Sequence, residues 1–231
     1  MTRQRVFAIE GFSAIQFLTP ANRSEELVRN LRLLGKFYAG KFLTERFAPD
    51  FERAYYYLDL AQIKSRRHYK ALNDLGWLFA TVSAPPNPDA AKALFEESFR
   101  QNDRQQRALY NLGTALLDKT DAGKLERARE LLLKAQEIPL WEDKPNQQLA
   151  SYINYNLACV SSAMAGLAAQ GEPRKCLLDD SIRFLKEAHA KAALRAETLK
   201  LDLAPGGDLE QLHASPAHTA QLRTIVPALS S

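Results

Sequence analysis

The chain has 231 residues, of which 46% are apolar and 25% are charged, and its formal net charge is +4. These values are ordinary for a folded globular protein and exclude a mainly disordered or collagen-like chain. The small positive charge permits an acidic partner without requiring one.

The composition favours helices, because glycine accounts for only 10 residues whereas alanine, leucine, lysine, arginine, glutamate and glutamine are abundant. No run of about 18 apolar residues occurs, which predicts no membrane span. Neither a signal-peptide cleavage pattern nor a lipidation motif is found, and we therefore expect a cytoplasmic protein.

Residues 1–23 are predicted to form an apolar segment ahead of the first helix. Its large apolar residues are Val6, Phe7, Ile9, Phe12, Ile15, Phe17 and Leu18. The run Ser24-Glu25-Glu26 then predicts the start of a long helix through about Leu43. Residues 1–23 are too apolar to form a tail that lies entirely in solvent. Two interpretations stay open: a cap packed on the following helices, or a docking segment for another protein.

Residues 24–194 carry a pattern that recurs with a period of 37. Its small residue follows an apolar or aromatic one at Tyr38-Ala39, Leu75-Gly76 and Leu112-Gly113. A second set of recurring positions comprises Ala54, Ala91 and Ala128, then Leu58, Phe95 and Leu132, then Ala61, Ser98 and Ala135. A looser fourth unit contains Leu157-Ala158 and then Ser181, Leu185 and Ala188. The spacing predicts two helices in each unit, held close by the small residues.

Turn and capping residues divide the units into helices. Asn87 followed by Pro88 is a favourable helix start, with Asn87 as the N-cap. Thr120-Asp121-Ala122-Gly123 predicts the same transition one unit later, and Asp50 predicts it in the first unit.

This pattern resembles the tetratricopeptide repeat, a helix-turn-helix unit of about 34 residues. Leu75-Gly76 with Phe79 and Ala91 with Phe95 and Ser98 match its spacing, as do the equivalent residues 37 positions later. The chain departs from the family at its first aromatic position, where Leu72 and Leu109 stand, and in the longer turn of each unit. The resemblance implies an all-α fold: a right-handed superhelical solenoid of about four helix-turn-helix units, with an N-terminal helix and a C-terminal helical cap.

Residues 195–231 are predicted to form that cap. Tyr155-Asn156-Leu157-Ala158-Cys159, then Asp208-Leu209-Glu210-Gln211-Leu212 with Ser215-Pro216 and Leu222, resemble a terminal repeat of bacterial proteins. His218 or Thr219 stands where that ending usually has an aromatic residue. Short helices around 208–213 and 216–226 are expected to fold back over the last repeat.

The sequence offers little that is typical of an enzyme. Cys159 and Cys176 are too few for a disulfide scaffold or a cysteine-rich metal site. Neither a GxGxxG nor a GxxxxGK[ST] phosphate loop occurs, and the four histidines lack the HExxH spacing of a zinc helix. We therefore expect a non-enzymatic protein with no catalytic residue, no cofactor and no metal.

The resemblance implies that the first helix of each unit lines a concave surface. Residues expected there are Lys70, Asn73, Asp74 and Trp77, then Arg107, Tyr110, Asn111 and Thr114, then Tyr152, Tyr155, Asn156 and Cys159. Nine of these are predicted to bind a partner: Lys70, Asn73, Trp77, Arg107, Tyr110, Asn111, Tyr152, Tyr155 and Asn156. Amides can bond a peptide backbone, cations a carboxylate, and aromatic rings supply contact area. The alternative is that the chain's own C-terminal tail fills this surface.

The predicted function is that of an adaptor or regulatory subunit that holds a protein or peptide partner, including an effector carried by another chain. The runner-up is a nucleic-acid-binding helical solenoid that uses the basic run 64–70, Lys64-Ser65-Arg66-Arg67-His68-Tyr69-Lys70. The plain interpretation of that run is a solvated turn between two helices.

Overall fold

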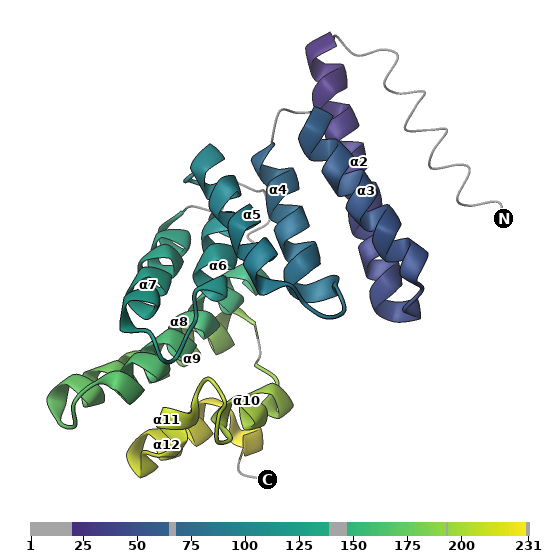
Figure 1. The fold of residues 1–231 in the computed structure, drawn as a ribbon. Helices are drawn as coiled ribbons and strands as arrows, with labels where there is room; N and C mark the ends of the chain where they lie inside the picture. The colour runs from purple at the N-terminus through teal and green to yellow at the C-terminus, as the bar shows by residue number, and fades with distance from the viewer. Residues whose placement is uncertain (1–19, 65–67, 139–146, 193, 230–231) are drawn as a thin grey trace. The chain divides into compact units, whose positions relative to one another are not determined.

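The computed structural model describes residues 20–64, 68–138, 147–192 and 194–229 (Figure 1). All regular elements in these ranges are helical and no strand occurs among them, which confirms the predicted all-α class. The apolar segment 1–18 and residues 65–67 of the basic run lie outside the described ranges. The chain divides into two compact units between Asp103 and Arg104, which is a point inside the predicted repeat region 24–194.

The first unit consists of two helix pairs. Helix α2 (Pro20–Glu45) packs against α3 (Ala48–Lys64), and α4 (Tyr69–Trp77) packs against α5 (Pro88–Gln101). A π-helical turn, η1 (Leu78–Val82), continues α4 without a break. The predicted start of α5 is confirmed, because Asn87 Oδ1 accepts a hydrogen bond from the Ala90 amide at 3.0 Å and Pro88 is the first helical residue.

The second unit contains two further pairs and a C-terminal segment. Helix α6 (Gln106–Ala115) packs against α7 (Ala122–Glu137), and α8 (Gln147–Leu167) packs against α9 (Glu172–Lys191). Asp121 is the N-cap of α7, with its carboxylate accepting from the Lys124 amide at 3.0 Å, as predicted. Helices α10 (Ala196–Leu203), α11 (Glu210–His213) and α12 (Pro216–Ile225) and the 3-10 turn η2 (Pro227–Leu229) complete the unit.

The positions that recur every 37 residues form the buried faces of these helices. The second helices bury Ala54, Leu58 and Ala61 in α3, Ala91, Phe95 and Ser98 in α5, and Ala128, Leu132 and Ala135 in α7. The residues assigned to the looser fourth unit, Ser181, Leu185 and Ala188, are buried in α9. The periodic pattern therefore identified the core correctly in all four pairs.

Two glycines allow the helices of a pair to approach closely. A β-carbon on Gly76 would lie 2.5 Å from Phe95 Cε1, and one on Gly113 would lie 2.9 Å from Leu132 Cγ. In the first pair the equivalent leucine, Leu58, comes close to Gly35, which lies one turn before Ala39 of the same core cluster. Only two residues separate the end of α2 from the start of α3. Leu58, ten residues after the first residue of α3, therefore lies opposite Gly35, ten residues before the last residue of α2.

In both α4–α5 and α6–α7, a hydrogen bond joins the start of the first helix to the end of the second helix. Ser98 Oγ donates to the Tyr69 carbonyl at 2.7 Å, and Gln106 Nε2 donates to the Ala135 carbonyl at 2.9 Å. The two bonds join equivalent positions 37 residues apart, with donor and acceptor exchanged between the helices. The first bond satisfies the buried hydroxyl of Ser98, and the second satisfies a carbonyl in the last turn of α7 that has no partner within the helix.

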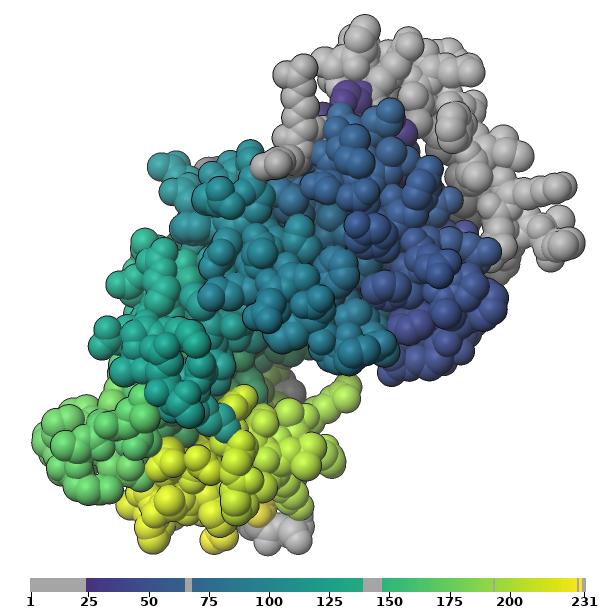
Figure 2. Space-filling view, in the orientation of Figure 1, coloured from purple at the N-terminus to yellow at the C-terminus, as the bar shows by residue number. Residues whose placement is uncertain are grey.

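The C-terminal segment packs on the α8–α9 pair, as Figure 2 shows for the yellow helices against the green ones. Its buried residues are Leu199, Leu209, Leu212, His218, Leu222 and Val226. The predicted short helices near 208–213 and 216–226 correspond to α11 and α12, whereas α10 was not predicted. None of the helices in the described ranges combines the length and apolar character that crossing a membrane requires.

Candidate protein-binding surface

Helices α6 and α8 carry six of the nine residues that the sequence predicts to bind a partner. In α6 the buried residues are Ala108, Leu109, Leu112 and Gly113. Arg107 and Tyr110 are left on the opposite face, one turn apart. Arg107 is exposed and forms no ion pair with any residue that the structure describes. Asn111, the next residue along, is half-buried.

The structure brings Tyr110 of α6 together with Tyr152 and Asn156 of α8. The two tyrosine rings are stacked, with centroids 6.5 Å apart and 24° between their planes. Asn156 Nδ2 donates to the Tyr110 hydroxyl at 3.3 Å and to the Tyr152 carbonyl at 3.1 Å. Tyr152 is 47% exposed. Burial raises the pKa of Tyr110, so this phenol stays neutral. We call these three residues the tyrosine–asparagine cluster.

Tyr155, predicted to bind a partner, contacts the chain's own C-terminal segment instead, and Cys159, expected on the same surface, is buried. The Tyr155 hydroxyl donates a hydrogen bond to Asp202 at the end of α10, and burial with the adjacent acidic groups raises the pKa of this tyrosine. Cys159 is 1% exposed, and burial also raises its thiol pKa, which makes it a poor nucleophile. The C-terminal segment therefore covers Tyr155, as the alternative interpretation predicts, but it leaves Tyr152 exposed.

The three remaining predicted residues lie on α4 in the first unit. Lys70 is exposed, and its ammonium nitrogen lies 5.6 Å from the centre of the Tyr69 ring. Trp77 is partly buried against the apolar core of that unit. Asn73 is only 1% exposed, so it is not on the surface as predicted. Its neighbour Asp74 is also buried and pairs with two cations of α2.

The described part of the basic run supplies two exposed cations, Lys64 and Lys70. The His68 ring stacks on Tyr69 with centroids 4.9 Å apart. Burial, together with the nearby charges of Arg32 and Lys70, lowers the pKa of His68, so it adds no charge at neutral pH.

A contact among Ser215, His218 and Asp179 was missed by the sequence analysis. The Ser215 hydroxyl lies 2.6 Å from His218 Nδ1, and His218 Nε2 lies 3.1 Å from Asp179 Oδ1. Ser215 is the N-cap residue of α12, and His218 is 6% exposed. A catalytic serine needs an open site with oxyanion donors beside it, and neither Ser215 nor His218 lines a described pocket. We interpret the contact as a tie between α12 and α9.

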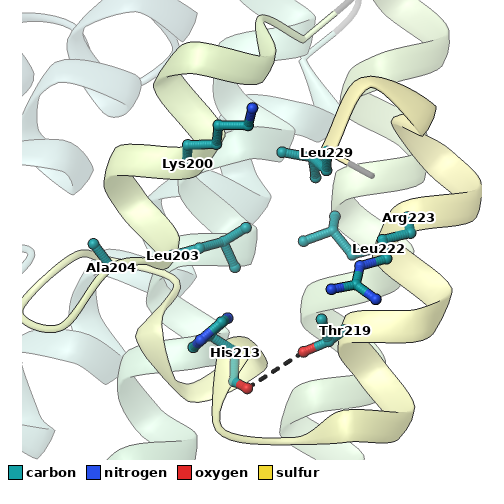
Figure 3. A pocket seen from close by; sticks show the side chains of 8 residues that line it. All are labelled: Lys200, Leu203, Ala204, His213, Thr219, Leu222, Arg223 and Leu229. Atoms are coloured by element: carbon teal, nitrogen blue, oxygen red, sulfur yellow. Dashed lines mark hydrogen bonds between the residues drawn. The ribbon is translucent and has the colours of Figure 1, made fainter. Parts of the chain in front are cut away.

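A pocket of about 200 Å³ lies within the C-terminal segment (Figure 3). It is lined by Lys200, Leu203, Ala204, His213, Thr219, Leu222, Arg223 and Leu229. The Thr219 hydroxyl is committed to the carbonyls of Leu212 and His213, at 2.9 and 3.3 Å. Small-molecule sites usually occupy about 300–1,000 Å³, so this pocket is smaller than a typical ligand site.

No group of three or more histidine, cysteine, aspartate or glutamate side chains that could hold a metal ion occurs in the parts of the chain that the structure describes. The tyrosine–asparagine cluster and Arg107 together comprise four of the nine residues that the sequence predicts to bind a partner. Comparison of the sequence with models of known protein families gives no match, and neither does comparison with curated proteins.

Proposed function

We propose that this chain is a non-enzymatic protein-interaction module, an adaptor or regulatory subunit that binds an extended segment of another protein in the cytoplasm. The observation that carries the proposal is the tyrosine–asparagine cluster beside Arg107. These side chains come from two different first helices, and they lie outside the periodic set that forms the core. Their arrangement is consequently not required by the packing of the helix pairs.

The chemistry of the cluster suits a peptide that carries an acidic group. Stacked tyrosines provide rigid contact area at a small cost in conformational entropy, and such residues are enriched at binding interfaces. The Asn156 amide can also bond a peptide backbone, and the exposed guanidinium of Arg107 can form a two-pronged contact with a carboxylate.

The proposal includes the arrangement that the tetratricopeptide resemblance implies. In it, the pairs α2–α3, α4–α5, α6–α7 and α8–α9 form a right-handed superhelix whose first helices line one concave surface. The recurring Gly76–Phe95 and Gly113–Leu132 contacts support a common pair geometry. The proposal keeps Lys70 and Trp77 of α4 as predicted binding residues of the first unit.

Selection from a library of displayed random peptides tests this function and does not require the partner to be identified first. The full chain should select extended peptides that share an acidic residue, and Tyr152→Ala should lose most of that binding. Lys186→Ala is the control, since Lys186 is exposed on α9 and is not among the residues predicted to bind a partner. Equal recovery of the same peptides by Tyr152→Ala, or no selection by the wild-type chain, would contradict the proposal.

A further inference from the structure

Four aromatic rings form a continuous row across the α2–α3 pair. Phe37 contacts Tyr38 edge-on at 5.3 Å, Tyr38 stacks on Tyr57 at 5.7 Å, and Tyr57 contacts Tyr56 at 5.5 Å, all between ring centroids. Phe37 and Tyr38 belong to α2, and the other two rings belong to α3, which runs beside it (Figure 1).

The two ends of this row are exposed. Phe37 is 54% exposed and Tyr56 is 60% exposed. Leu33, one turn before Phe37, and Ile63, two turns after Tyr56, continue the apolar surface with exposures of 55% and 62%. We call Leu33, Phe37, Tyr38, Tyr56, Tyr57 and Ile63 the aromatic face.

The neighbouring pair α4–α5 leaves the outer members of the aromatic face exposed, whereas Tyr38 and Tyr57 are partly buried against the core. Arg32 and Lys36 of α2 pair with Asp74 of α4 at 2.7 and 2.9 Å, which fixes the side of α2 that faces α4. Leu33 and Phe37 each follow one of these cations, so they are turned about 100° around the helix. On α3, the Tyr55 ring contacts Phe79 of η1 at 5.9 Å, and Tyr56 again follows by one residue.

We propose that residues 1–18 of this chain dock on the aromatic face. This segment contains eight large apolar residues, counting Met1, and only three charged side chains, those of Arg3, Arg5 and Glu10. Placing it on the exposed rings would remove apolar surface from water on both sides of the contact. An exposed patch of this kind otherwise marks a site for another protein.

The segment has the length and the point of attachment that such docking requires. It leads directly into α2 at Pro20, and Phe37 lies 17 residues further on, about 25 Å along the helix axis. Eighteen residues span about 60 Å when extended and about 27 Å as a helix, so either form that turns back at Pro20 reaches Phe37. The docking involves the first unit only, and it is independent of the proposed peptide binding at α6 and α8.

Photo-crosslinking in the full chain tests the proposal. The crosslinker p-benzoylphenylalanine is placed at Phe37 in one variant and at Tyr56 in another, with Leu167 of α8 as a matched exposed apolar position. Trypsin should release residues 6–23 as one peptide, because Arg5 and Arg23 flank them. We expect this peptide to be joined to the Phe37 and Tyr56 positions within one chain, and not to the Leu167 position.

Changing Phe12 and Ile15 together to serine should remove most of the crosslinked product without changing the circular dichroism of the helices. A covalent dimer would identify a second copy as the occupant and would overturn the proposal. Crosslinks to other parts of the chain, no crosslink at all, or equal crosslinking from the Leu167 position would also overturn it. The peptide selection described above would be unaffected by any of these results.

Discussion

Gly76 and Phe95 lie so close together that a β-carbon on the glycine would come within 2.5 Å of the phenylalanine ring. No ordinary side-chain contact is that short, so α4 and α5 depend on the absence of a side chain at position 76. Gly113 and Leu132 repeat the relationship between α6 and α7.

Gly76→Ala should therefore lower the free energy of unfolding. The added methyl group forces the helices or the ring to shift, at a cost of about 1–3 kcal/mol, which exceeds the roughly 1 kcal/mol gained in helix propensity. Gly40→Ala is the control, because no atom lies within 4 Å of a β-carbon at that exposed position of α2. It should stabilise the protein by about 0.5–1 kcal/mol. Denaturant unfolding measures both, and equal effects would contradict the close approach.

The proposed peptide surface should be separable from stability. Arg107→Ala should weaken an acidic peptide by about tenfold to a hundredfold, since charged hydrogen bonds contribute about 1.5–3 kcal/mol and about 1.4 kcal/mol is tenfold. Arg107→Ala and Asn156→Ala should barely change the melting temperature, because neither residue belongs to the buried set. Fluorescence polarisation with a selected peptide measures the affinity, and thermal unfolding measures the melting temperature. An unchanged affinity in the double variant would count against the site.

Because of Tyr155, the free energy of unfolding should decrease as the pH becomes alkaline. Its pKa is raised in the folded chain, chiefly by burial, whereas an unfolded tyrosine has a pKa of about 10. The stability that it contributes is therefore fully present below about pH 10 and is lost as the pH rises above that value. Tyr155→Phe should reduce this loss without abolishing it, since the pKa of Tyr110 is raised too. Denaturant unfolding across this pH range measures the effect, and exposed Tyr152→Phe is the control, which should behave like the wild type. If the stability of Tyr155→Phe falls with pH as steeply as that of the wild type, the assignment is wrong.

The tie between α12 and α9 should contribute to stability and not to catalysis. His218→Ala removes a buried ring and its contacts with Ser215 and Asp179, and it should lower the free energy of unfolding by about 1–3 kcal/mol. His213→Ala, at an exposed position, should change it by less than about 0.5 kcal/mol. A fluorophosphonate probe should not label Ser215. Labelling that disappears in His218→Ala would reveal a nucleophile and contradict the non-enzymatic function.

The sequence predicted the buried face of each helix pair because small and large residues recur at fixed intervals along helices. Gly35 escaped that prediction, since its contact with Leu58 depends on the short turn at Arg46-Phe47 rather than on the period. The positions of Tyr110, Tyr152 and Asn156 followed from the same register. That register placed them correctly on first helices, but it could not show how closely α6 and α8 approach.

Predictions failed where distant parts of the chain meet. Tyr155 bonds Asp202, which lies 47 residues later, and no local pattern indicates that pairing. Asn73 lies in a stretch of α4 that is buried from Ala71 to Gly76, more completely than an amphipathic pattern implies. The aromatic face left a weaker signal: Phe37 and Tyr56 are large residues at positions outside the recurring core set.

The different turn lengths decide which parts of this chain are interchangeable. Facing residues are 19 positions apart in both α4–α5 and α6–α7, so a duplication or deletion of 37 residues within that region keeps every partner at its distance along the chain. Gly35 and Leu58 are 23 positions apart, so the close approach of α2 and α3 has a different spacing from that of the two middle pairs. A designer lengthening this protein would copy the middle pairs and leave α2–α3 as a fixed end module.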